Sequence, residues 1–221
     1  MPSLVKPLRG PRLIAVATIL VAAGVFLTLL LIPDPEQAWR SAVRLTARSS
    51  AVLFLLAFGA SAATTLWPGT FTRWMRGNRR YLGLSFAASH TIHAFTFLSL
   101  AGLSQPLAEQ VLPRGMIVLG GIGYFFIYAL AATSSNKAQA ILGMRWWGRL
   151  HVVGTHWLWL QFLISFVKHA PDHPEDWLGV VLVVAVMTLR IVARLKMNSG
   201  WRARATLPAR ANIPSAPKGL T

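Results

Sequence analysis

Six long apolar stretches constrain the fold of this chain more than any other feature. Each contains 17 to 22 residues, and they cover 13–32, 50–67, 82–103, 115–133, 150–167 and 177–193. A helix of about 20 apolar residues crosses the hydrocarbon core of a bilayer, and within lipid the backbone amides have to be satisfied inside each segment. The alternation typical of a membrane β-barrel is not visible. The stretches therefore predict an all-α integral membrane protein, a bundle of six transmembrane helices surrounded by the lipid bilayer.

Composition and charge support this class. Only 13% of the residues are charged and 54% are hydrophobic, whereas a soluble domain carries about a quarter charged residues. Of the 22 Lys and Arg residues, 17 lie on one side of the expected bundle, and all six acidic residues lie on the other. By the positive-inside rule, the basic side faces the cytoplasm, and both termini lie there. The net charge of +16 is thus a topology signal, and since no nucleic-acid-binding module accompanies it, we expect no nucleic-acid partner.

The remaining segments are too short to fold as separate domains. We expect a cytoplasmic N-terminal segment at 1–12, a six-helix domain at 13–198 and a flexible basic cytoplasmic tail at 199–221, which is rich in Pro, Ala, Arg and Ser. The sixth stretch is the weakest, because Arg190 interrupts its inner end and has to reach the interface. No nucleotide-binding motif is present, so a nicotinamide or flavin domain has to come from another protein.

Four of the six histidines lie inside apolar stretches: His90 and His93 in the third, His151 and His156 in the fifth. An ionisable residue inside a membrane span is a functional hypothesis by default. On a helix, His90 and His93 are about 60° apart, whereas His151 and His156 are about 140° apart. Both stretches start on the cytoplasmic side, so one histidine of each is expected at similar depth. Two facing imidazoles at similar depth can ligate a haem iron between helices.

Other interpretations of these histidines stay open. Each imidazole can simply form a hydrogen bond with a hydroxyl group or a carbonyl of a neighbouring helix. A zinc ion needs three or four ligands, and the expected spans offer no carboxylate or thiolate to complete such a set. With no cysteine in the chain, thiolate-ligated iron–sulfur clusters and covalently attached haem are excluded. His169 and His173 lie near acidic residues and are interpreted as interfacial or solvated side chains.

Two segments resemble the ferric reductase-like transmembrane domain family. They are RRYLGLSFAASHTIHAFTF (79–97) and TSSNKAQAILGMRWWGRLH (133–151). In each segment, arginines of a connection on the inner side are followed at a fixed distance by a histidine. Within the family, the likeness is to the haem-binding membrane subunits of bacterial methionine sulfoxide reductase systems. It covers the third to fifth stretches well and the rest of the chain by topology only.

The resemblance implies b-type haem, one or two groups per chain, in a bacterial inner membrane. It also implies that electrons cross the membrane from a quinol or a cytoplasmic flavin donor to an acceptor on the outer side. FMN or a quinone is then a further cofactor, and a separate redox partner protein or quinol supplies at least one half-reaction. The family's histidines match His93 and His151. A third family histidine falls at Ile164, which cannot ligate iron, so we expect His90 or His93 to pair with His156.

The resemblance also assigns a role to arginines at the cytoplasmic mouth of the bundle. These residues could neutralise haem propionates or attract a flavin phosphate; they are Arg79, Arg80, Arg145 and Arg149. Arginines at this depth equally serve as topology signals that meet lipid headgroups. The competing hypothesis for the whole chain is a haem-free scaffold or transporter-like membrane protein, whose histidines only pack or relay protons. Haem content separates the two hypotheses.

Overall fold

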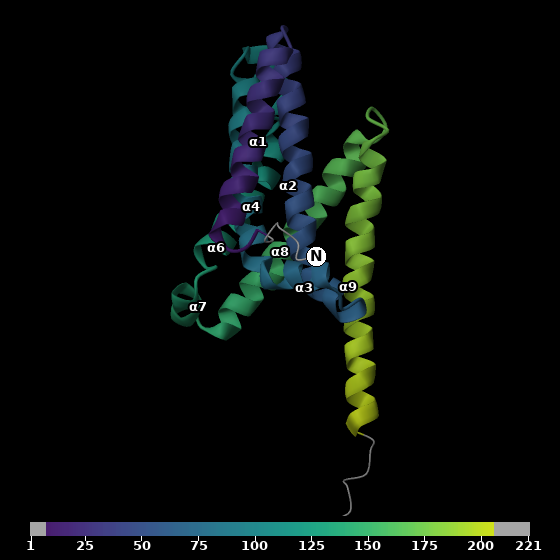
Figure 1. Ribbon diagram of the computed structural model, residues 1–221. Coiled ribbons are helices and arrows are strands. Elements are labelled where there is room, and N and C mark those ends of the chain that lie inside the picture. Colours follow the sequence, from purple (N-terminus) through teal and green to yellow (C-terminus); the bar gives the residue numbers. More distant parts are fainter. Residues whose placement is uncertain (1–7, 206–221) are drawn as a thin grey trace, which may run out of the picture.

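The computed structural model describes residues 8–205 (Figure 1). In this range the secondary structure is entirely helical. The helices are α1 (Pro11–Leu31), α2 (Pro35–Leu66), α3 (Thr70–Gly77), α4 (Arg79–Ala101), α5 (Gln105–Val111), α6 (Arg114–Ala132), α7 (Asn136–Leu142), α8 (Met144–His169) and α9 (Asp176–Ala205). The all-α prediction is thereby confirmed for the part of the chain that is described.

Six long helices overlap the six predicted stretches: α1, α2, α4, α6, α8 and α9. All but α4 are long and apolar enough to cross a membrane. Helix α4 has 23 residues, but arginine, serine, threonine and histidine interrupt its apolar sequence. It packs against α1, α2 and α6, and its side chains Ser85, Ser89 and Thr96 are buried. The apolarity of the helices therefore supports five of the six predicted spans.

Helix α2 begins well before the predicted stretch 50–67. Asp34 caps its first turn, since the carboxylate oxygen Oδ2 accepts a hydrogen bond from the Gln37 amide at 2.7 Å, and Pro35 occupies the first helical position. An ion pair of 2.8 Å between Glu36 and Arg40 supports the next turn. The segment expected as a connection is therefore the N-terminal half of a 32-residue helix.

At the C-terminal end, the structure differs from the expected boundary of the tail. Helix α9 continues to Ala205, so residues 199–205 of the expected flexible tail are helical. Residues 206–221 and 1–7 lie outside the described residues. Three short helices, α3, α5 and α7, occupy segments that were expected as plain connections.

The closest helix packing joins α2 to α4, with α1 beside both of them (Figure 1). Small hydroxyl residues line this α2–α4 seam and are fully buried: Thr46, Ser50, Ser85, Ser89 and Thr96. Small side chains allow helix backbones to approach closely. The Thr46 and Thr96 hydroxyl groups, and those of Ser50 and Ser89, form hydrogen bonds across the seam. Helix α8 packs instead on α6, α7 and α9, and meets α2 and α4 mainly through aromatic rings.

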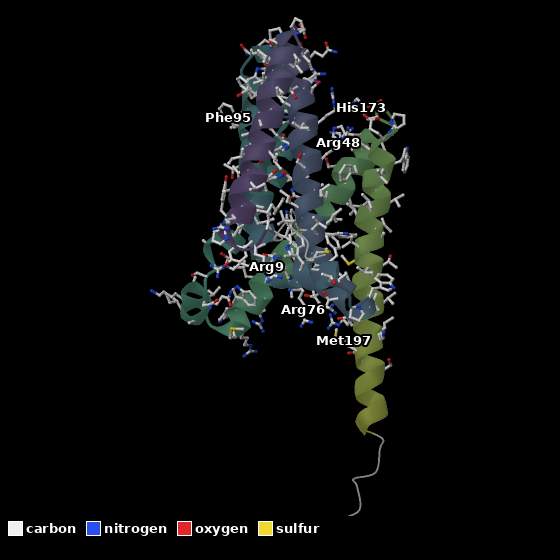
Figure 2. All side chains as sticks on the ribbon, in the orientation of Figure 1. Arg9, Arg48, Arg76, Phe95, His173 and Met197 are labelled. Carbon is white, nitrogen blue, oxygen red and sulfur yellow. The ribbon has the colours of Figure 1, made fainter. Side chains whose placement is uncertain are left out.

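An ion-pair cluster fastens the start of α9 and the connection before it to α2. Arg48 contacts Asp176 at 2.8 Å and Glu175 at 3.0 Å, and Asp176 is only 7% exposed. Figure 2 shows Arg48 near His173, beside the connection between α8 and α9. This connection lies below the upper ends of α1 and α2 in Figure 1. The cluster therefore sets the height of α8 relative to α2.

We expect Arg48→Gln to lower the free energy of unfolding by about 1–3 kcal/mol, because it leaves the nearly buried Asp176 carboxylate without its charged partner. Thermal unfolding of the detergent-solubilised protein measures this effect. Arg44→Gln is the matched control, since Arg44 lies one turn earlier and its guanidinium contacts Ser41 rather than an acid of the described chain. Equal losses in both variants would contradict a specific role for the cluster.

Candidate functional site

The two histidines of α4 lie side by side, as the helical spacing predicts. Their ring centroids are 4.9 Å apart. The Nδ1 atom of His93 lies 3.0 Å from the Thr46 hydroxyl of α2. The Nδ1 atom of His90 is buried and has no hydrogen-bond partner among the described residues; its ring packs against Phe86, Tyr124 and Phe162.

The contacts of Thr46 indicate which nitrogen of His93 carries the proton. The Thr46 hydroxyl has one hydrogen, and its shortest contact is the Ala42 carbonyl at 2.8 Å, the back-bond that threonine commonly forms in helices. The oxygen is then left as an acceptor for the Nδ1–H group of His93. In this arrangement, the lone pair of His93 lies on Nε2. A metal-ligating histidine is typically held in the same way, with one nitrogen bound to the protein and the other free.

The two histidines of α8 have different surroundings. Nε2 of His151 lies 2.9 Å from a guanidinium nitrogen of Arg79, and its ring stacks on Trp147 with centroids 5.1 Å apart. A guanidinium can only donate, so Nε2 is the acceptor and its lone pair is already engaged. His156 lies with Nδ1 2.7 Å from the Val152 carbonyl. Because a carbonyl only accepts, this contact leaves the lone pair of His156 on Nε2.

The histidines of α4 and α8 lie in two separate layers. His93 contacts Thr46 of α2, whereas His156 packs edge-on against Phe58 of α2 with centroids 5.6 Å apart. Twelve residues of helix separate Thr46 from Phe58, a rise of about 18 Å at 1.5 Å per residue. The structure therefore does not bring His93 and His156 to similar depth.

Aromatic rings occupy the space between the layers. Phe58 stacks on Phe54 at 5.2 Å, and Phe54 contacts Phe86 and Phe162, each at 5.3 Å. Both of these rings contact His90, at 5.4 and 5.9 Å. His90 and His156 are thus connected through phenylalanine rings and not by direct contact.

A cavity of about 260 Å³ opens next to the α8 layer, between α2, α4, α6, α7 and α8. Its volume lies slightly below the usual range of about 300–1,000 Å³ for small-molecule sites. Phenylalanine and leucine side chains form much of its walls, and its polar lining includes Arg79, Arg80, Ser134, Asn136, Gln139, His151 and Thr155. An apolar cavity with a cationic rim suits an amphiphilic ring system that carries negative charge at one edge.

Three of the predicted site residues therefore share this cavity: Arg79, Arg80 and His151. Arg149 does not line it. Its side chain is exposed, and its guanidinium carbon lies 5.1 Å from the ring centroid of Trp146. His169 and His173 keep local partners, the Ser165 carbonyl and the Glu175 carboxylate, at 2.8 and 3.9 Å.

One histidine of α4 has the free nitrogen lone pair that a haem iron needs in a protein ligand. His93 is an imidazole oriented by the Thr46 hydroxyl, its Nε2 lone pair is left free, and its ring packs beside the rings of His90 and Phe97. Within residues 8–205, no three His, Asp or Glu side chains come together. A metal at one position thus has at most two protein ligands of these types, the number that a bis-histidine haem uses.

Two residues that matter here were missed or misjudged at the sequence level. Thr46 lies outside the predicted stretch 50–67, so this stretch does not indicate it as a partner of His93. Arg190 was expected to reach the interface, but its guanidinium donates to the Phe58 carbonyl at 2.7 Å and lies 3.9 Å from the centroid of the Phe58 ring. The capping sequence Asp34–Pro35 was the signal that could have extended α2 to include Thr46.

Comparison with known proteins supports the resemblance that the two motifs carry. The chain is 30% identical over 147 residues to the protein-methionine-sulfoxide reductase haem-binding subunit MsrQ of Azospira oryzae, covering 62% of this chain and 60% of that protein. MsrQ of Klebsiella pneumoniae is 30% identical over 57% of this chain and 61% of its own length. MsrQ of Ralstonia nicotianae is 27% identical over 68% of this chain and 70% of its own length.

The chain is similar to MsrQ. This confirms the likeness to methionine sulfoxide reductase subunits that the sequence predicts. The matched part spans about three fifths of the length of the Azospira and Klebsiella proteins. No family model matches the chain, and no solved structure matches it.

We expect Arg79→Leu to lower the free energy of unfolding by about 1–3 kcal/mol, because it leaves Nε2 of His151 without its donor in a partly buried site. Denaturant unfolding in detergent measures the loss. Arg80→Leu is the control, because the Arg80 side chain is exposed and contacts mainly the Tyr81 ring. The assignment is contradicted if the Arg80 variant loses as much stability as the Arg79 variant.

Proposed function

We propose that this chain is a haem-bearing membrane subunit of the MsrQ kind, which carries electrons across a bacterial inner membrane. Six helices cross the bilayer, and both termini lie in the cytoplasm. The donor is a quinol or a cytoplasmic flavin, and the acceptor is a partner protein on the outer side. The similarity to MsrQ supports this proposal, and the oriented imidazole of His93 inside the bundle is the structural observation that carries it.

Each part of the proposed site has a stated role. Haem, when bound, supplies one-electron redox chemistry. His93 matches a family histidine and is the preferred ligand, with His90, His151 and His156 as the other imidazoles available. The phenylalanine rings around them exclude water, which tunes the potential of an iron centre. Arg79 and Arg80 bind anionic groups at the cavity, such as haem propionates or the phosphate of FMN, or they lie beside a quinone. Arg149, which faces away from the cavity, is left with an electrostatic role at the membrane surface.

A haem-free membrane protein is the second candidate, and one observation favours it. The phenylalanine rings already fill the space between the histidine layers, and His93, His151 and His156 each have a hydrogen-bond partner. Such packing needs no cofactor for its stability.

The haem proposal predicts a b-type spectrum in the dithionite-reduced minus oxidised difference of the purified protein, at one or two haems per chain by pyridine haemochrome. His93→Leu is expected to lose the haem that this residue binds, because leucine fills the space but has no ligating atom. His169→Leu is the control, since His169 is exposed and bonded only to its own helix. A wild-type protein without haem, after expression with ample haem supply, supports the haem-free candidate instead.

The proposed orientation can be tested by cysteine labelling, because the chain has no native cysteine. Glu109→Cys on α5 and Lys137→Cys on α7 each place a thiol at an exposed position. We expect a membrane-impermeant maleimide to label position 109 in intact spheroplasts, and position 137 only after the membrane is opened. The reverse pattern would overturn the orientation, and labelling of both positions in intact spheroplasts would overturn the six-span arrangement.

A further inference from the structure

We propose that the cavity between α2, α4, α6, α7 and α8 binds an anionic phospholipid of the adjacent membrane leaflet. The phosphate group of the lipid lies at Arg79 and Arg80, and the adjoining end of one acyl chain lies along the apolar walls. The inference needs no haem and therefore goes beyond the proposed function. It rests on that function only in taking the long helices to lie in a bilayer.

Positive charge collects where α4 begins, on one side of this cavity. Arg79 and Arg80 line the cavity, and the guanidinium of Arg190 lies 3.9 Å from the centroid of the Phe58 ring, which forms part of the wall. None of the described residues that line the cavity is acidic. Arginine binds phosphate oxygens through several N–H groups at once, and apolar surroundings strengthen the attraction. The cavity therefore favours an anion on this side.

The acidic side chains of the protein are too far away to neutralise these arginines. The acids that contact α2 closest to the cavity are Glu175 and Asp176, and both are bound to Arg48. Arg48 lies thirteen residues before Ser61, the residue of α2 that contacts Arg79. About 20 Å of helix therefore separates the two contacts. A counter-charge for the arginines of the cavity has to come from outside the described residues.

The donors of the two lining arginines are only partly used. Arg79 contacts Nε2 of His151 at 2.9 Å and the Ser61 hydroxyl at 3.5 Å, which leaves part of its five N–H groups free. The side chain of Arg80 is exposed, with its guanidinium carbon 5.9 Å from the centroid of the Tyr81 ring. Both guanidinium groups can therefore donate to one phosphate.

The remaining walls decide which kind of phosphate compound fits. They are largely apolar and include Leu84, Phe86, Ile127, Leu130 and Leu158. An acyl chain fills such a space without leaving a polar group unpaired, whereas the polar edges of a flavin ring would lack partners there. The cavity volume of about 260 Å³ is smaller than a drug-sized site. It therefore holds only the phosphate and the start of one chain, and the rest of the lipid stays in the bilayer.

The segment that lines one side of the cavity, α7 with the start of α8, is suited to a membrane surface. It projects sideways from the lower part of the bundle (Figure 1). Its apolar side chains Ile141, Met144 and Trp146 are 89%, 68% and 62% exposed, and Lys137 and Arg145 are exposed among them. Apolar and basic side chains that are exposed together are typical of helices at the interface of a membrane with anionic lipids. A phospholipid can thus reach the arginines from within its leaflet.

The test is the binding of phosphatidylglycerol to the full-length protein, purified in a neutral detergent and stripped of lipid. Native mass spectrometry counts the bound lipids, and thermal unfolding during a lipid titration gives the affinity. We expect one phosphatidylglycerol per chain, bound at least tenfold more tightly than phosphatidylcholine, whose headgroup has no net charge. Inorganic phosphate is expected to bind at least tenfold more weakly than phosphatidylglycerol, because it has no chain to place along the apolar walls.

One variant fills the cavity. Gly83 lines it on α4, and a Cβ atom built at Gly83 meets no other atom within 4 Å. Gly83→Leu therefore places a side chain in open space, in a helix that favours leucine over glycine, and we expect at least a tenfold loss of phosphatidylglycerol affinity. Gly121→Leu on α6 is the matched control. A Cβ atom there is equally unobstructed, but Gly121 is not among the residues that line the cavity, so we expect the wild-type affinity.

A second variant removes charge without changing the shape of the cavity walls. Arg80→Gln is expected to weaken phosphatidylglycerol binding at least tenfold and to bring it close to the affinity for phosphatidylcholine. Arg149→Gln makes the same change at an exposed arginine that does not line the cavity, and we expect it to bind phosphatidylglycerol as the wild type does. Equal losses in both variants would mean that the lipid responds to surface charge in general, and would overturn the inference.

The other outcomes separate the inference from the proposed function. Equal affinity for the two lipids, or unchanged binding in Gly83→Leu, overturns the inference. It also fails if inorganic phosphate or FMN binds as tightly as phosphatidylglycerol and displaces it, a result that leaves the proposed function standing. Haem content is measured on the same samples. Lipid binding that is confined to molecules without haem overturns the inference alone, whereas specific lipid binding by a protein that never carries haem supports the inference and overturns the proposed function.

Discussion

Hydrogen bonds between buried hydroxyl groups of α2 and α4 shape the seam between these two helices. Thr46, Ser50, Ser89 and Thr96 are completely buried there. Thr46 meets both His93 and Thr96, and Ser50 meets Ser89 at 2.9 Å. Because these side chains are small, the same residues that satisfy each other also let the two helices approach closely. Without this seam, the imidazole of His93 would lack its fixed orientation.

Much of the fold follows from the sequence, because the apolar stretches are long and the helical state is imposed by the membrane. All six predicted stretches overlap a long helix. The pairing of His90 with His93 on one helix face also follows, since it depends only on the helical repeat. The likeness to MsrQ rests on two short motifs, one on α4 and one that runs through α7 into α8, and is supported over about three fifths of the chain.

The errors arose where apolarity was used to mark the ends of helices. Helix α2 carries Arg40, Arg44 and Arg48 in its N-terminal half, so the predicted stretch started after them, at residue 50. Their guanidinium groups bind to Glu36, Ser41 and the acids at the start of α9. Hydropathy does not show these partners, because it scores each residue without regard to the groups that it contacts. Missing this half of α2 meant missing Thr46, and with it the contact that orients His93.

The depth of the histidines could not be predicted for a related reason. Counting from the expected inner boundaries of two helices assumes that both boundaries lie at the same level. The structure sets the level by side-chain contacts instead: Arg48 fixes the start of α9 to α2, and Arg79, the first residue of α4, meets His151. These contacts place His151 at the cationic cavity and the α4 histidines more than two helical turns away from the α8 layer. The cavity is where an anionic donor group would approach, and in the orientation that we propose the α4 layer lies nearer the outer surface. The two layers thus occupy the two ends of the electron path that we propose, with phenylalanine rings between them.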